Sequence, residues 1–348
     1  MIALRIIAFI VGLAGALLTF SSAVRTVVVP RGQSLLLQRL VFRSLARVMH
    51  TLARRTDDWS ARDRILVHHA PFGLVLLVVA WVLSTTVSFA LMFWGIGVET
   101  WREAFRISGS SVTTLGFAST GTDWPGNILA VTESLIGLIL VALLISFLPT
   151  IYGLFSSRER VVALMAVRAG TPPSGAELLM RFHTIGSAID ASGIWEQFED
   201  WFNELAETHT SFMALPFFRS PNPERSWITT GGAVLDAAAL HLSVVDEPVD
   251  PRAALCLRAG YSALHDIAGA YGIEVPDGPA PDDPIGVTRQ EFDAVADRLG
   301  AAGIPLVSDR EQAWRDFQGW RVNYDAALIA LAGFVSAPYA PWSSDRSG

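Results

Sequence analysis

The sequence contains no lysine, a single cysteine and few charged residues. All 26 basic side chains are arginine, against 33 Asp and Glu. Charged residues make up 17% of the 348 positions, whereas an average soluble protein has about 25%. This scarcity excludes an ordinary soluble fold for the whole chain and indicates membrane segments. Because Cys256 is the only cysteine, no disulfide can form within the chain, which fits a cytoplasmic location for its region.

Motifs for common cofactor and metal chemistry are also absent. There is no Gly-rich dinucleotide fingerprint after a strand, no Walker loop, no HExxH pair and no EF-hand loop. The histidines of the second half are scattered, and we expect each to be structural. We therefore expect no enzyme activity, no cofactor and no metal site.

The charges that are present divide the chain into two halves. Residues 1–169 hold 15 arginines and 8 acids, and residues 170–348 hold 11 arginines and 25 acids. An acidic second half argues against nucleic acid as a partner. We predict a basic membrane half with domains at 1–64 and 65–157, followed by a cytoplasmic, mostly helical domain at 168–348.

Three apolar runs, at residues 2–20, 65–97 and 127–154, have the length that a span requires, about 20 residues. Nine arginines between residues 21 and 67, and two more at Arg158 and Arg160, place the flanks of these spans inside. This predicts a multi-pass protein of the cell membrane, with its N-terminus outside and its C-terminal domain in the cytoplasm. A cleaved signal peptide is the alternative for the first run, because Ser21-Ser22-Ala23 resembles a cleavage site.

Residues 34–55 form a basic amphipathic stretch, with Arg39, Arg43, Arg47 and Arg54 at helical spacing on one face. This predicts a helix that lies on the inner leaflet near anionic lipid headgroups, or one that packs on the cytoplasmic domain.

The connection between the second and third runs carries too few charges for an ordinary solvated loop. It contains Ser-Ser-Val-Thr-Thr-Leu-Gly-Phe-Ala-Ser at 110–119. A dehydrated cation needs oxygens at close range, and backbone carbonyls from four copies of one strand can supply them. Gly116 allows left-handed backbone angles, so that successive carbonyls can face one axis. Thr114 adds a hydroxyl, and Phe117 can wedge the strand against surrounding helices.

Thr114-Leu115-Gly116-Phe117-Ala118 resembles the selectivity filter of the potassium-channel family, usually written TVGYG. The resemblance covers residues 65–155 and implies an all-α pore-loop module: an outer span, a short pore helix at 99–113, the filter and an inner span. It implies that carbonyls at Thr114, Leu115, Gly116, Phe117 and Ala118 coordinate a permeant cation, with potassium the expected ion. Since one chain supplies one pore loop, it also implies a homotetramer.

Two positions depart from the family pattern. Ala118 stands where the family has a second glycine. A left-handed conformation costs an L-residue about 1–2 kcal/mol, so the outermost carbonyl ring can be turned away or missing. Ser119 stands where the family usually has Asp. A nonselective cation channel is therefore a close alternative.

Other residues are candidates for supporting the filter or gating the pore. Thr113 and Glu133 are the candidate supports, because an ionisable residue inside an apolar run is a functional candidate. Glu133 could hold the filter strand from behind, face the pore, or pair with Arg102 or Arg106 at the outer rim. Further along the same span, Gly137 and Pro149 are the candidate gate positions, since proline removes a helix hydrogen bond.

The leading hypothesis is a passive cation channel whose partners are identical subunits and membrane lipids. An unknown ligand of the cytoplasmic domain stays open. The second hypothesis is a membrane-anchored receptor or scaffold with a vestigial pore. In the cytoplasmic domain we expect capping boxes at Thr288 with Glu291 and at Ser308 with Glu311, and a last helix from residue 309 to about 334.

Overall fold

The computed structural model describes residues 2–27, 36–53, 55–56, 58–121, 124–185 and 191–346, without the side chains of residues 36, 38, 39, 43, 191 and 192. Every named element in these residues is a helix, which confirms the all-α expectation for the described part. The helices are α1 (Ile2–Val27), α2 (Leu36–Ala53), α3 (Trp59–Leu66), α4 (His69–Ile96), α5 (Trp101–Val112), α6 (Trp124–Ala169), α7 (Gly175–Thr184), α8 (Ala191–Ser211), the short 3₁₀ helix η1 (Leu215–Phe217), α9 (Trp227–Val244), α10 (Pro251–Tyr271), α11 (Arg289–Ala301) and α12 (Arg310–Phe334).

The helices form two compact units. The first consists of Met1–Asp57 with Arg64–Gly153, and the second of Asp58–Asp63 with Leu154–Gly348. The division therefore falls within α3 and within α6, and each unit has its own core of buried apolar side chains.

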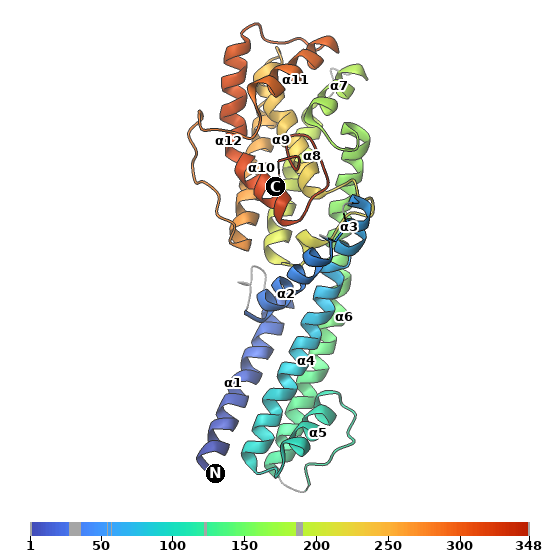
Figure 1. Cartoon of the computed structure of the whole chain (residues 1–348), viewed down its shortest axis with the longest axis vertical. Helices are drawn as coiled ribbons and strands as arrows, with labels where there is room; N and C mark the ends of the chain where they lie inside the picture. The colour runs from blue at the N-terminus through green and yellow to red at the C-terminus, as the bar shows by residue number, and fades with distance from the viewer. Residues whose placement is uncertain are drawn as a thin grey trace. The chain divides into compact units, whose positions relative to one another are not determined.

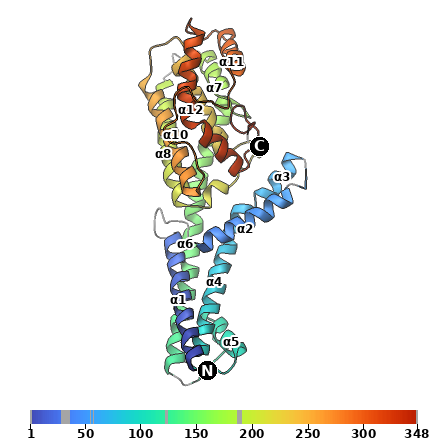
Figure 2. The ribbon, with the colours of Figure 1, turned by 60° about the vertical axis from the view of Figure 1, so that its left-hand side comes forward.

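Three helical segments in the described residues are long and apolar enough to cross a membrane: Ile2–Val27, Trp59–Ile96 and Trp124–Ala169. In the first unit α1 runs beside α4, and α5 lies at the end of the unit that holds the N-terminus (Figures 1 and 2). Small buried residues of α1, such as Ala16 and Ala23, allow the close approach to α4. The indole of Trp81 on α4 also donates a hydrogen bond to Ser22 Oγ at 3.3 Å.

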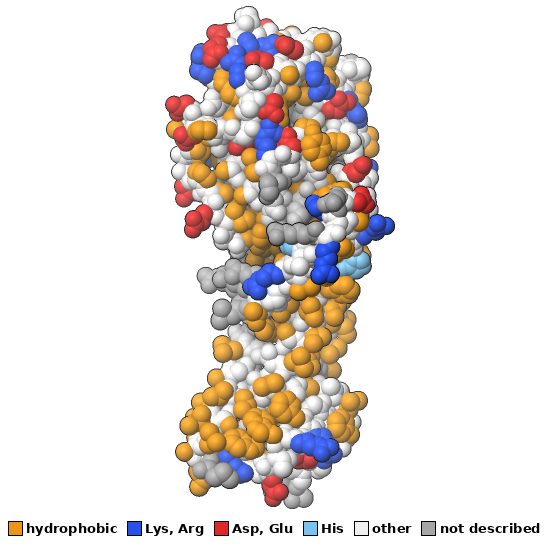
Figure 3. Space-filling view, viewed as in Figure 1, with side chains coloured by type: hydrophobic (Ala, Val, Ile, Leu, Met, Phe, Trp, Pro, Cys, Tyr) orange, Lys and Arg blue, Asp and Glu red, His pale blue; other side chains and the backbone are white. Residues whose placement is uncertain are grey.

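The surface of the first unit is largely apolar, whereas the second unit carries many acidic and basic side chains (Figure 3). Large apolar side chains are exposed along α1, α4 and the first part of α6, including Leu17, Leu83, Val131, Leu138 and Ile145. An apolar surface of this extent indicates contact with lipid or with another chain. The three apolar helices and this surface support a membrane protein.

The predicted amphipathic stretch forms helix α2, which packs against α4 through Phe42. Residues 34 and 35 and Arg54 lie outside the described residues, and so do the side chains of Arg39 and Arg43. The expected arrangement of these three arginines therefore stays a prediction.

The second unit is built around α9, which is buried along almost its whole length. Helices α7, α8, α10 and α12 pack against it. The apolar face of α8, with Trp195, Phe198 and Phe202 at its centre, is buried as its helical spacing predicts.

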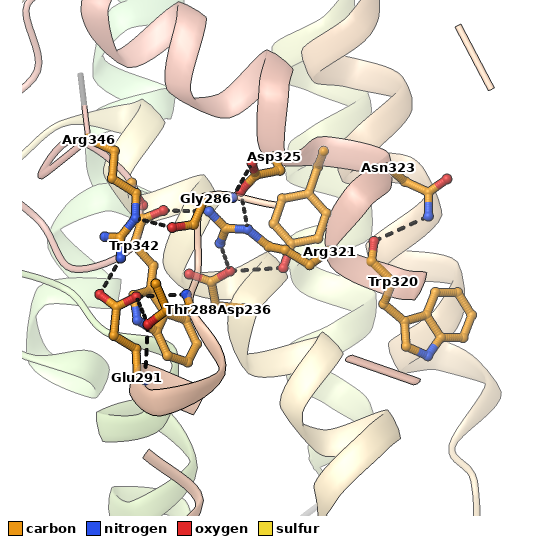
Figure 4. A network of polar contacts seen from close by, with 12 residues as sticks. Asp236, Gly286, Thr288, Glu291, Trp320, Arg321, Asn323, Asp325, Trp342 and Arg346 are labelled. Carbon is orange, nitrogen blue, oxygen red and sulfur yellow. Dashed lines mark hydrogen bonds and ion pairs between the residues drawn. The ribbon is translucent and has the colours of Figure 1, made fainter. Parts of the chain in front are cut away.

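A buried network of polar groups connects α9 and α12 to the C-terminal segment (Figure 4). Arg321, which is fully buried, donates to Asp236 on α9, to Asp325 at 2.7 Å and to the carbonyl oxygen of Trp342. Asp325 in turn accepts a hydrogen bond from the backbone N–H of Gly286 at 2.8 Å. Segments far apart in the sequence are thus held by one guanidinium group.

One of the two predicted capping boxes is confirmed and the other is wrong. Thr288 accepts from Glu291 N, and the Glu291 side chain accepts from Thr288 N at 2.8 Å. At α12 the capping residue is Asp309, whose carboxylate accepts from the backbone N–H groups of Glu311 and Gln312. Asp309 caps the helix in place of Ser308 because its charged carboxylate lies one residue closer to the helix. There it can satisfy two N–H groups that have no partner within the helix and interact with the helix dipole.

Candidate functional site

The segment after α5 is exposed and has an unusual backbone. Thr114 has a φ of 57° and Gly116 a φ of 67°, both in the left-handed region, while Leu115 between them lies outside it. Glycine adopts this region without strain, but a β-branched residue such as threonine rarely does. Strain of this kind is found at functional sites, where the surrounding structure maintains it.

Helix α5 ends at this segment in a Schellman motif. The backbone N–H of Thr114 donates to Ser111 O at 2.9 Å, and that of Leu115 donates to Ser110 O at 3.0 Å. Gly116 N also donates to Ser110 O, at 3.3 Å, and Ala118 N donates to Ser110 Oγ at 3.0 Å. The N–H groups of the segment are therefore turned toward the last turn of α5.

The orientation of the N–H groups determines where most of the carbonyl groups point. In a planar trans peptide the C=O of one residue points opposite to the N–H of the next. The carbonyl oxygens of Thr113, Thr114, Leu115 and Phe117 therefore point away from α5. Within the described part of the chain, none of these oxygens accepts a hydrogen bond. They form a row of acceptors that is available to water or to a cation.

Ala118 keeps an ordinary backbone conformation, in keeping with the cost of a left-handed conformation for an L-residue. It lies outside the left-handed region, and its side chain packs against the apolar cluster formed by α4 and α5. The residue that is held in a strained conformation is Thr114 instead. No signal in the sequence identifies Thr114 as strained, because the Schellman position usually holds glycine.

The expected packing of Phe117 is not formed within one chain. Its side chain is 59% exposed, and that of Leu115 is 70% exposed. If the aromatic ring wedges the segment, as the family resemblance implies, the surface it contacts belongs to another subunit.

Residues of α6 hold the last turn of α5 in place. Ser134 Oγ donates to Ser111 O at 2.8 Å, two residues before the exposed segment begins. A Cβ atom at Gly137 would lie only 2.1 Å from Val112 O, so glycine is the residue that permits this close approach. This contact provides a packing reason for Gly137, and its assignment as a gate stays a prediction.

Glu133 is fully buried and lies behind α5. Its Oε1 atom contacts the Ser108 hydroxyl, which also lies 2.9 Å from Thr86 O. The Ser108 hydroxyl is therefore a donor shared between Glu133 and the backbone of α4. The alternative of a rim ion pair is wrong for Arg106, which pairs with Glu103 at 2.7 Å. Glu133 thus contacts the middle of α5, and its role as a support of the filter stays a prediction.

We expect Glu133→Ala to lower the stability of the first unit, since it removes a buried partner of Ser108 and leaves a void. The expected loss is about 1–3 kcal/mol. Glu133→Gln should retain most of the stability, because its amide can donate to Ser108. The measurement is the melting temperature of the detergent-solubilised full chain.

The matched control for this prediction is Glu103→Ala on α5. Glu103 and its partner Arg106 are 40% and 50% exposed, so their ion pair contributes little. A loss in Glu103→Ala as large as that in Glu133→Ala, or equal losses in the Ala and Gln variants, would contradict the role of the buried contact.

The remaining candidate residues lie at either end of the site. Thr113 is the C-cap of α5, and its hydroxyl donates back to Gly109 O at 2.6 Å. Pro149 lies inside α6, which continues beyond it as a helix. Proline has no N–H to donate to Ile145 O. The assignment of Pro149 as a gate position stays a prediction.

No protein-family model, no curated protein and no solved structure matches this chain. The resemblance to the potassium-channel family therefore depends on the filter-like segment and its neighbours alone.

Proposed function

We propose that this chain is one subunit of a homotetrameric cation channel of the cell membrane, with potassium as the expected permeant ion. The observation that carries the proposal is the row of carbonyl oxygens at Thr114, Leu115 and Phe117. These oxygens point away from α5 and accept no hydrogen bond from the described residues. Carbonyls in such a row can replace the hydration shell of a cation.

The proposed number of subunits follows from the resemblance to the potassium-channel family. One chain offers a single carbonyl at each level of the segment, which is too few to surround an ion. Four chains around an axis would offer four at each level, as the resemblance to the potassium-channel family implies. The exposed side chains of Leu115 and Phe117 would then be covered by neighbouring subunits.

The charge at the end of α5 also favours this arrangement. The C-terminal end of α5, with its partial negative charge, lies directly before the segment and would favour a cation there. The orientation in the membrane is inferred from the arginines that flank the spans, which place the second unit in the cytoplasm.

Cation flux through the purified full chain in liposomes tests the proposal. We expect potassium flux that barium blocks. No flux of potassium or sodium from protein that remains folded would refute it, and would favour the receptor or scaffold alternative.

A nonselective channel is the second candidate, because Ala118 and Ser119 replace the residues of the family pattern. If the ion-binding conformation needs a left-handed residue at 118, alanine opposes it by about 1–2 kcal/mol and glycine does not. Ala118→Gly should then raise the potassium-to-sodium permeability ratio by about fivefold or more.

Ala118→Ser is the control for Ala118→Gly, since it changes the side chain at the same position without giving the backbone left-handed freedom. Permeability ratios measured from reversal potentials should change in Ala118→Gly and not in Ala118→Ser. An unchanged ratio in Ala118→Gly would show that the outer carbonyl does not limit selectivity.

A further inference from the structure

A second site is present in the second unit, away from the segment after α5. It is a pocket of about 740 Å³. One wall is the part of α6 that belongs to the second unit, which begins at Leu154, and the other is the loop that precedes α9. Ser156 and Arg160 line it from α6, and Ser220, Asn222 and Arg225 line it from the loop. All of these residues belong to one compact unit.

Two side chains at this pocket have buried polar atoms without partners. The hydroxyl of Ser220, which is only 5% exposed, and Nε of Arg225 find no hydrogen-bond partner among the residues that the structure describes. An orphaned buried donor is costly, so each such group calls for a partner that the protein chain does not provide. A ligand that accepts hydrogen bonds would provide a partner for both the Ser220 hydroxyl and Arg225 Nε.

The charges around the pocket indicate the sign of that ligand. Neither Arg160 nor Arg225 forms an ion pair with another described residue. The acid that lines the pocket, Glu159, is already paired with the buried Arg158 at 2.8 Å. The pocket therefore has an excess of positive charge and of hydrogen-bond donors.

The walls of the pocket are held in place before any ligand binds. Arg158 donates from Nη1 to Leu215 O at 3.0 Å and from Nη2 to Phe218 O at 2.6 Å, which fastens α6 to the loop. Within the loop, the Asn222 side chain accepts from Glu224 N at 2.9 Å and leaves its amide nitrogen able to donate. A preformed site loses less entropy on binding than a flexible one.

We propose that this pocket binds an anionic phosphate group, with Arg225, Arg160 and Ser220 as its main ligands. Guanidinium groups bind phosphate through two parallel N–H donors, and hydroxyl groups complete the set of donors. The phosphate can belong to a soluble molecule or to a lipid headgroup. A lipid is one of the two sources because the pocket residues of α6 follow directly in the sequence after its apolar part.

The test measures binding to the purified full chain and does not depend on ion conduction. Inorganic pyrophosphate is titrated calorimetrically, and retention of phosphatidylglycerol against phosphatidylcholine is measured by native mass spectrometry. Arg225→Gln and Arg160→Gln should each weaken binding about tenfold or more, since each removes a charged donor. Arg160 is exposed, so its variant tests the site even if Arg225→Gln is destabilising.

Arg258→Gln is the control, because Arg258 is an exposed arginine on α10 that does not line the pocket. Pyrophosphate binding that only the pocket variants weaken supports a soluble ligand. Selective retention of phosphatidylglycerol that only they abolish supports a lipid. Binding of neither probe, or equal weakening in Arg258→Gln, overturns the proposal.

Discussion

Replacing Gly116 by alanine is expected to reduce potassium flux by about a hundredfold or more while the chain remains folded. At a φ of 67°, alanine costs about 1–2 kcal/mol, and a tetramer incurs this cost four times. No atom lies within 4 Å of an added Cβ, so the effect arises from the backbone and not from a clash. The cost is large enough to change the direction of the carbonyls on which conduction depends.

Gly121→Ala is the matched control for this prediction. Gly121 has a φ of 76°, and there too no atom lies within 4 Å of an added Cβ. The two substitutions therefore cause similar strain in the same connection, but only Gly116 lies in the proposed filter. Flux in liposomes should collapse in Gly116→Ala and persist in Gly121→Ala. Equal effects would mean that loop strain, and not ion coordination, explains the loss.

Arg321→Ala is expected to destabilise the second unit by about 3–5 kcal/mol, the typical cost of leaving buried charges without their partner. Burial alone would lower the pKa of Arg321, but the carboxylates of Asp236 and Asp325 more than reverse this, so that the guanidinium is charged. Without it both acids lose their counter-charge and Trp342 O loses a donor. The C-terminal segment would then lose its hydrogen bond to α12 (Figure 4).

The melting temperature of the full chain, followed by tryptophan fluorescence, measures this effect. For a unit of this size, we expect a decrease of roughly 10 °C or more in Arg321→Ala. Arg315→Ala on the same helix is the control, since Arg315 is 54% exposed and its partner Glu311 is 3.7 Å away. The melting temperature of Arg321→Lys should lie between those of Arg321→Ala and Arg315→Ala, because lysine keeps the charge but not the planar set of donors. Similar melting temperatures in Arg321→Ala and Arg315→Ala would contradict a central role for the network.

Much of the fold could be predicted from the sequence because its strongest patterns extend over many residues. Runs of apolar residues long enough to cross a bilayer correspond to α1, α4 and the first part of α6. The short helix expected at 99–113 is observed at Trp101–Val112. The apolar spacing on α8 likewise identified side chains that are buried.

Features that depend on single groups meeting in space could not be predicted. Arg321 and Asp236 are both ionisable and far apart in the sequence, and nothing local distinguishes them from surface charges. The pocket could not be predicted either, because Ser220 and Arg160 are far apart in the sequence and line it together only in the folded chain.

The backbone of the candidate site was predictable only in part. Gly116 could be identified as left-handed because glycine is the residue that suits this conformation. Thr114 could not, since its conformation is imposed by the end of α5 and not by its own preference. Ala118 keeps an ordinary conformation, in keeping with the cost of a left-handed L-residue, and packs on α4 and α5.

Anomalous diffraction from the full chain crystallised with thallium ions, which resemble potassium in size and charge, tests the central claim most directly. The account predicts four chains around one axis, with anomalous peaks on that axis in contact with carbonyl oxygens of Thr114, Leu115 and Phe117. A monomer or dimer, or thallium bound only elsewhere, would contradict it.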